Sequence, residues 1–172
     1  MSKVLSAAVI GCGRMGAYTR PELEFSMPKG WLPHNHAAAI KAADGIDLIA
    51  LSDVSEEALN AAASCHDVGS IYTDYRKMFK EKSLDIITVA TRTDVRPEII
   101  KEAITAGVKG IHAEKPLGQS VKQEKDIFDL LRSGGVAFTY GVYRRYIPVY
   151  RQAKEICESG ELGELWQVSV SF

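Results

Sequence analysis

The residues with the clearest chemical potential are three glycines that directly follow an apolar run near the N-terminus. Residues 9–16 read Val-Ile-Gly-Cys-Gly-Arg-Met-Gly, a G-x-G-x-x-G spacing. Gly11 lets the chain turn sharply, Gly13 leaves out a Cβ where a pyrophosphate comes close, and Gly16 lets a following helix pack on a sheet. The N–H groups and the dipole of that helix would bind phosphates. The expected contacts of a dinucleotide cofactor in this turn are Gly11, Cys12, Gly13, Arg14 and Met15.

Two of these side chains allow a second interpretation. Arg14 lies in the turn and would face the pyrophosphate, but a solvated arginine fits the same position. Cys12 stands between two glycines, where packing is a better explanation than redox chemistry.

A carboxylate, Asp53, ends the next apolar run, which begins at Ile46. A carboxylate at this place accepts both hydroxyls of an adenosine ribose and repels a 2′-phosphate. No Arg or Lys occurs in residues 54–57 to offset that repulsion. The sequence therefore favours NAD over NADP. The alternative is that Asp53 caps a helix that begins near Ser55.

A lysine, Lys115, follows a third apolar run within Ala113-Glu114-Lys115-Pro116. Ligands of open α/β sheets bind at the carboxyl ends of strands, so Lys115 is expected to contact the cofactor. Its ammonium could also hydrogen-bond a substrate hydroxyl and assist proton movement. Glu114 would orient Lys115 or line the nicotinamide site, and Pro116 allows a cis peptide bond. The alternative is a surface lysine paired with Glu114.

The elements that must position these residues alternate between apolar runs and helical patterns. Helical periodicity is seen after each run, for example over Pro97–Ala106 and Val121–Arg132. This alternation predicts an α/β fold with a Rossmann-type doubly wound parallel sheet. The expected strands are Leu5–Ile10, Asp47–Leu51, Leu84–Ala90, Val108–Ala113 and Val136–Gly141.

The first helix is expected to be interrupted, because prolines cannot lie in a helix interior. Pro21, Pro28 and Pro33 place an insertion over Tyr18–Pro33, after which the helix resumes near His34–Ala43. Both a functional loop and tolerated decoration fit this insertion. His34 and His36 are two residues apart and cannot share one helix face, so no metal site is expected from them.

Composition narrows the range of partners. The chain has 172 residues, three widely spaced cysteines and a net charge of −1 without a basic block. Nucleic acid and anionic membranes are therefore not expected as partners, and no disulfide framework is expected. The apolar runs are shorter than a membrane span and no secretory signal pattern is present. These features predict a soluble, cytoplasmic protein of about one domain.

The last segment differs from the rest of the chain. A helix is expected from near Ile147 to Leu162-Gly163, and Glu164–Phe172 then alternates between apolar and polar residues. This alternation predicts the first strand of a second, truncated α/β domain. The predicted division is residues 1–145 for the dinucleotide-binding domain and 146–172 for the linking helix and this strand. Its apolar face also predicts self-association into a homo-oligomer.

Taken in order along the chain, the motifs resemble those of the Gfo/Idh/MocA family of dinucleotide-dependent oxidoreductases. The resemblance covers essentially the whole chain. The motifs that carry it are Gly11–Gly16, His36–Ile40, Ser52-Asp53, Ala90-Thr91, Ala106–Lys109, Ala113–Leu117, Arg145–Pro148 and Gly160–Gly163.

The resemblance implies an NAD(P)-dependent dehydrogenase that transfers hydride between nicotinamide and a sugar, polyol or related hydroxy substrate. It also implies that Thr91 contacts the cofactor and that Arg145 lies near the nicotinamide half. Arg96 departs from the family, which commonly has His near this position. Family members carry a second domain that supplies the substrate pocket, so this chain alone is expected to be inactive. A truncated, non-catalytic dinucleotide-binding module is the alternative function.

Overall fold

The computed structural model describes residues 3–18, 22, 25–26 and 32–170 of the chain. These residues divide into two units, Met1–Gly141 and Val142–Phe172. Within the described residues, no helix has the length and apolar character needed to cross a bilayer.

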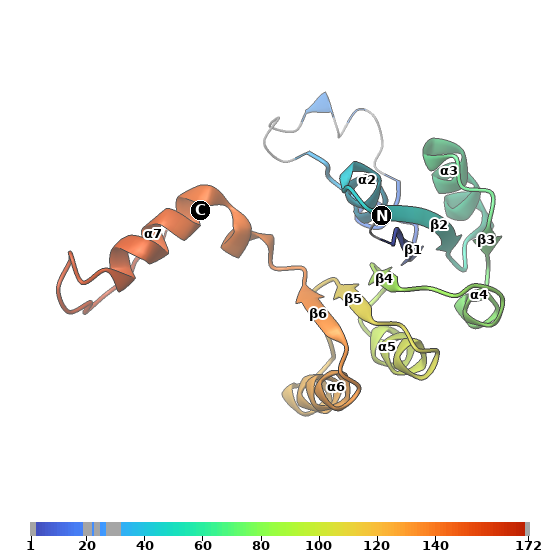
Figure 1. Cartoon of the computed structure of the whole chain (residues 1–172). Helices are drawn as coiled ribbons and strands as arrows, with labels where there is room; N and C mark the ends of the chain where they lie inside the picture. Colours follow the sequence, from blue (N-terminus) through green and yellow to red (C-terminus); the bar gives the residue numbers. More distant parts are fainter. Residues whose placement is uncertain (1–2, 19–21, 23–24, 27–31, 171–172) are drawn as a thin grey trace. The chain divides into compact units, whose positions relative to one another are not determined.

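One parallel sheet of six strands, in the order β3-β2-β1-β4-β5-β6, organises the first unit (Figure 1). The predicted doubly wound sheet is thereby confirmed, because the chain first builds outward from β1 to β3 and then returns to the other side of β1 at β4. The strands are β1 (Leu5–Ile10), β2 (Ile46–Ser52), β3 (Ile71–Tyr72), β4 (Ile86–Val89), β5 (Gly110–Ala113) and β6 (Ala137–Tyr140).

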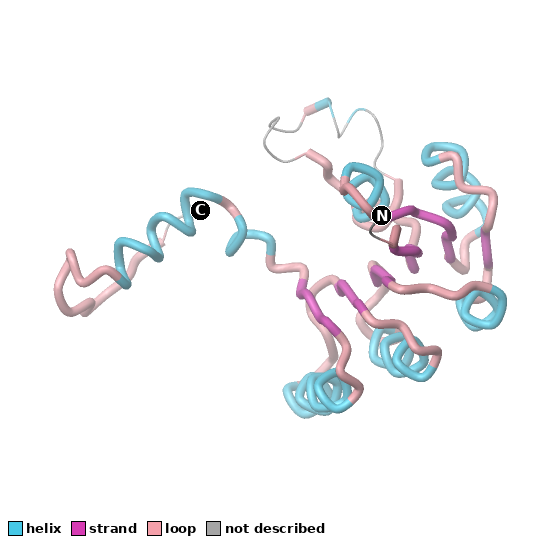
Figure 2. The backbone as a smooth tube through the Cα atoms, in the orientation of Figure 1, coloured by secondary structure: helices cyan, strands magenta, loops and turns pink. Residues whose placement is uncertain are grey.

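Helices cover both faces of this sheet, as the ribbon and the tube show (Figures 1 and 2). Two of them pack on one face, and three pack on the other. On the first face lie α2 (His36–Ala42) and α3 (Glu56–His66), and on the second lie α4 (Tyr75–Glu81), α5 (Arg96–Thr105) and α6 (Val121–Ser133).

Two apolar cores follow from this layering. Alternate residues of β1 enter opposite cores: Val9 packs with α2 and α3, and Ile10 packs with α4 to α6. Both side chains are at most 2% exposed. This double burial explains why the strand sequences are continuously apolar rather than alternating. Strand β3 has only two residues, too few to show any periodicity, and it was not among the expected strands.

The second unit contains η2 (Tyr143–Tyr146) and α7 (Pro148–Glu158). The helix ends earlier than expected, because Gly160 adopts a φ of +79° just after it. The structure corrects the prediction of a strand over Glu164–Phe172. Residues 164–170 form no hydrogen-bonded strand, and residues 171–172 lie outside the described residues. A strand needs a neighbouring strand, and the second unit supplies none among its described residues. Trp166 is 90% exposed, and the predicted self-association stays a prediction.

A partly exposed group of hydrogen bonds joins the starts of β1 and β4. Asp85, which precedes β4, accepts hydrogen bonds from Lys3 Nζ at 2.9 Å and from the Ser6 backbone N–H at 3.1 Å. The Ser6 hydroxyl donates to the same carboxylate at 3.1 Å. The hydrogen bond from Lys3, followed by that from the Ser6 backbone, lowers the pKa of Asp85 to about 2.

We expect Asp85→Asn to lower the unfolding temperature at pH 7. The lowered pKa means that ionised Asp85 stabilises the fold above its unfolded pKa of about 3.9. This stabilisation is lost as the pH falls through about 2. The difference between the two proteins should therefore shrink as the pH falls, which thermal unfolding at several pH values measures. Asp47→Asn, at an exposed carboxylate on β2, is the control. A pH-independent difference would contradict this account.

Candidate functional site

The glycine turn lies at the carboxyl end of β1, where the sheet order changes direction between β1 and β4. Gly11 has a φ of +95°, and a Cβ there would lie 2.7 Å from the Ala90 carbonyl carbon, after β4. A Cβ on Gly16 would lie 1.6 Å from the Gly11 carbonyl oxygen. A Cβ on Gly13, in contrast, would meet no atom within 4 Å. Gly11 therefore lets the turn approach the backbone of Ala90, and Gly16 lets the chain approach the backbone of Gly11. Gly13 leaves open space beside the turn.

Helix α2 begins against this turn, and most of the predicted insertion between them lies outside the described residues. Residues 14–17 form a turn in which Gly16 N–H donates to the Gly13 carbonyl at 3.0 Å. When the chain returns, the N–H groups of His36 and Ala37 donate to the Met15 and Gly16 carbonyls, both at 2.9 Å. The predicted return to a helix after the prolines is thus confirmed. These bonds fix the start of α2 against the glycine turn.

Asp53 is tied to the same turn. Its Oδ2 accepts a hydrogen bond from the Cys12 backbone N–H at 2.6 Å, and its Oδ1 accepts one from Ser55 N–H at 2.8 Å. The cap of α3 is Ser55, whose side chain accepts from Ala58 N–H. The alternative role of Asp53 as the helix cap is therefore wrong. A carboxylate has about four lone-pair sites, so Asp53 retains capacity for ribose hydroxyls.

The two remaining side chains of the turn differ in environment. Cys12 is fully buried, and its Sγ lies 3.6 Å from the Ser52 carbonyl oxygen as a donor. Burial, followed by the charge of Asp53, raises the pKa of Cys12 to about 12. Cys12 therefore stays a thiol and fills space, because only a thiolate is a good nucleophile. Arg14 is exposed beside Gly13.

A buried arginine connects the loops that follow β4 and β5. Arg96, at the start of α5, is 3% exposed, and its guanidinium donates to the carbonyl oxygens of Thr91 and Pro116. Burial lowers the pKa of Arg96. Sequence reasoning identified Arg96 only as a departure from the family. The structure shows that it holds the loop of Thr91 and the loop of Lys115 in one arrangement.

The segment Glu114-Lys115-Pro116 follows β5 at the carboxyl edge of the sheet. The Lys115–Pro116 peptide bond is cis, as expected. Lys115 is exposed, and its backbone N–H donates to Glu114 Oε2 at 3.3 Å. The Glu114 carboxylate forms an ion pair with His36, at 3.5 Å between Oε1 and Nε2. The described ion pairs include none between Lys115 and Glu114, so the alternative of a surface pair has no support.

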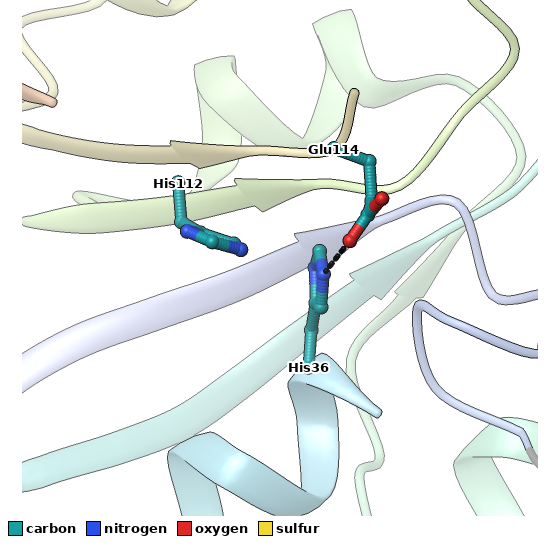
Figure 3. A group of neighbouring side chains, drawn as sticks. All are labelled: His36, His112 and Glu114. Carbon is teal, nitrogen blue, oxygen red and sulfur yellow. Dashed lines mark ion pairs between the residues drawn. The ribbon is translucent and has the colours of Figure 1, made fainter. Parts of the chain in front are cut away.

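Glu114 belongs to a group of three polar side chains that also contains His36 and His112 (Figure 3). The two imidazole rings meet edge to face, with their centroids 4.8 Å apart. Burial, followed by the proximity of His36, lowers the pKa of His112 to about 4. Pairing with His36 lowers the pKa of Glu114 despite its partial burial. Sequence reasoning missed this group, because its members come from distant parts of the chain.

The structure thus brings most of the expected site residues to one edge of the sheet. They follow four neighbouring strands, β2, β1, β4 and β5, in that spatial order. Arg145 lies in η2 of the second unit and is exposed. The expected residues at the edge of the first unit are Gly11, Cys12, Gly13, Arg14, Met15, Asp53, Thr91, Glu114 and Lys115.

Comparisons with known proteins agree with this arrangement. Residues 5–142 match the model of an oxidoreductase family, GFO_IDH_MocA, described as having an NAD-binding Rossmann fold. An uncharacterized oxidoreductase of Bacillus subtilis is 28% identical over 95% of this chain and 42% of its own length. The scyllo-inositol 2-dehydrogenase (NAD(+)) of the same species is 26% identical over 95% of this chain and 43% of its own length.

A solved structure of a dehydrogenase also matches this chain over most of its length. The crystal structure of myo-inositol 2-dehydrogenase from Lactobacillus plantarum superposes with a TM-score of 0.76 at 29% identity, over 94% of this chain and 43% of that one. The chain therefore spans less than half the length of the relatives that it matches.

We expect Gly16→Ala to destabilise the first unit, because the new methyl group would overlap the Gly11 carbonyl oxygen. The loss in free energy of unfolding should be about 1–3 kcal/mol or more. Gly13→Ala, in the same turn, faces open space and should change stability by less than about 0.5 kcal/mol. Urea unfolding of the three proteins measures both effects. Equal stability of the two variants would show that the close approach at Gly16 is not a constraint.

Proposed function

The chain belongs to the Gfo/Idh/MocA oxidoreductase family, and from this premise we propose that it is the nucleotide-binding part of a dehydrogenase acting on CH–OH groups. The observation that carries the proposal is the joining of Asp53 to the glycine turn at the switch point of the sheet. Ligands of open α/β sheets bind at such a switch point. The family is NAD-binding, which agrees with a carboxylate at residue 53.

The proposed site holds NAD through backbone and carboxylate groups. Gly13 leaves room for the pyrophosphate, and the N–H groups of the turn would donate to it. Asp53 would accept the hydroxyls of the adenosine ribose with the lone pairs that Cys12 and Ser55 leave free. Thr91 would line the adenosine side.

Lys115 is the proposed catalytic residue. NAD supplies the acceptor for the hydride that leaves the substrate carbon. The Lys115 ammonium would hydrogen-bond the substrate hydroxyl and hold or pass on its proton. Two features support this role: Lys115 follows a strand at the ligand-binding edge, and Arg96 anchors the carbonyl of the next residue, Pro116. Glu114 would help to orient the loop through the Lys115 backbone.

The substrate class is proposed from the relatives. Two of them are named as dehydrogenases of scyllo-inositol and myo-inositol. We therefore propose a polyol, sugar or related hydroxy compound. A non-catalytic dinucleotide-binding module is the second candidate. The native mass separates the two, because a protein with a further catalytic domain would be near twice 18.9 kDa.

We expect the chain to bind NADH at least about tenfold more tightly than NADPH, a difference of about 1.4 kcal/mol. The reason is repulsion between Asp53 and the 2′-phosphate. Asp53→Asn removes the charge but keeps an acceptor for Cys12 N–H, so it should narrow the preference without disrupting the turn. Fluorescence titration with both cofactors measures the preference. Equal affinities of the unmodified chain would rule out this role for Asp53.

In the native protein, assayed with NAD and a panel of polyols, we expect Lys115→Ala to lower kcat by about 100-fold. The affinity for NAD should change much less than kcat, because the glycine turn and Asp53 are expected to supply most of the cofactor contacts. Lys109→Ala is the matched control, since Lys109 is exposed at the opposite end of β5. Normal turnover of the Lys115 variant would leave Lys115 without a catalytic role.

A further inference from the structure

Three side chains with metal-binding atoms converge between α2 and β5 (Figure 3). His36 comes from the first residue of α2, His112 from within β5, and Glu114 directly follows β5. Because side chains alternate along a strand, His112 and Glu114 point to the same face of the sheet, the one that α2 covers. One ligand atom from each residue lies within 4.8 Å of the others.

His36 is the member whose environment most needs a partner. It is 7% exposed, and both ring nitrogens are buried without a hydrogen bond from any described residue. Its Nε2 lies 3.5 Å from Glu114 Oε1, beyond ordinary hydrogen-bond length. A buried polar nitrogen without a hydrogen bond is costly, so native structures rarely leave one without a function.

His112 is oriented by a neighbour in the way that metal-binding histidines usually are. Its Nδ1 lies 2.8 Å from the hydroxyl of Thr139, the residue paired with His112 on the neighbouring strand β6. When the hydroxyl accepts the Nδ1 proton, Nε2 keeps a free lone pair on the side of His36 and Glu114. Such an outer hydrogen bond fixes the tautomer and the ring orientation of metal ligands.

The donor set and its spacing suit one class of ion. Two imidazoles and one carboxylate match the three-ligand sites of Zn²⁺ and related transition metals, whereas Mg²⁺ and Ca²⁺ prefer all-oxygen sites. Ligand atoms on a tetrahedral Zn²⁺ are about 3.3 Å apart, given bond lengths of about 2.0 Å. The His36–Glu114 pair is already close to this separation, and the third atom requires a movement of the order of 1 Å.

We propose that His36, His112 and Glu114 bind a divalent transition-metal ion, with Zn²⁺ as the representative ion. The ion would join the start of α2, which the glycine turn anchors, to the loop of Lys115. Its fourth position would be open to solvent, because His112 and Glu114 are only partly buried. This proposal does not depend on NAD binding.

The test is a calorimetric titration of the chain with Zn²⁺, combined with the absorption spectrum of bound Co²⁺. Cys65 is exposed and Cys157 is half-buried, so both are first replaced by serine to remove competing thiols. We expect one ion per chain, with a Kd on the order of micromolar or tighter. The unfolding temperature should rise with Zn²⁺ concentration, because the folded state alone holds all three ligands together.

Variants then identify the ligands. His112→Ala and Glu114→Gln should each weaken Zn²⁺ binding at least about tenfold, and Thr139→Val should weaken it by about tenfold through the outer hydrogen bond. His34→Ala is the control, since His34 lies outside the group and should leave the affinity unchanged. Circular dichroism checks that each variant is folded.

Two results would overturn the proposal. One is the absence of Zn²⁺ and Co²⁺ binding by the folded chain. The other is binding that His112→Ala, Glu114→Gln and Thr139→Val all leave unchanged. Titration of the His112→Ala and Thr139→Val variants with NADH keeps the two questions separate, because neither residue is among the proposed cofactor contacts.

Discussion

The constraint on which the rest of the site depends is the contact between Gly16 and the Gly11 carbonyl. Any side chain at residue 16 would occupy the position of that oxygen. With both glycines in place, the Met15 and Gly16 carbonyls can accept hydrogen bonds from the first N–H groups of α2. The turn also brings the Cys12 N–H to the Asp53 carboxylate. One steric condition therefore sets the positions of the first strand, the helix after it and the end of β2.

The residues that encode this contact are local, which is why the sequence predicted it. The glycine spacing and the apolar run before it lie within a few residues of each other, and Asp53 terminates the next apolar run. The strands beside the switch point were predicted for the same reason, since burial on both faces makes them continuously apolar. The second unit was predicted less well. The alternation over residues 164–170 is real, but alternation alone cannot provide the neighbouring strand that a ladder needs.

The long-range contacts could not be predicted from the sequence. Arg96 was notable only for not being a histidine, and its two carbonyl partners come from the loops after β4 and β5. His112 seemed an ordinary strand residue, because its partner Thr139 belongs to a strand that pairs only once the sheet is assembled. His36 was assessed against His34, its neighbour in sequence, whereas its neighbours in space are His112 and Glu114. In each case the missing information was which distant segments of the chain the assembled fold brings together.

These long-range contacts have a common effect, which is to hold separate segments together at the carboxyl edge of the sheet. The loops at the carboxyl edge follow different strands, and nothing in the ladder itself holds them in one arrangement. Arg96 joins two of them through the backbone carbonyls of Thr91 and Pro116, so this anchoring does not occupy the Lys115 side chain. The His36–Glu114 pair joins a third element, α2, to the same edge. Backbone anchoring fixes where these loops lie while the Lys115 side chain stays exposed, and the proposed binding of a cofactor and a substrate would require both properties.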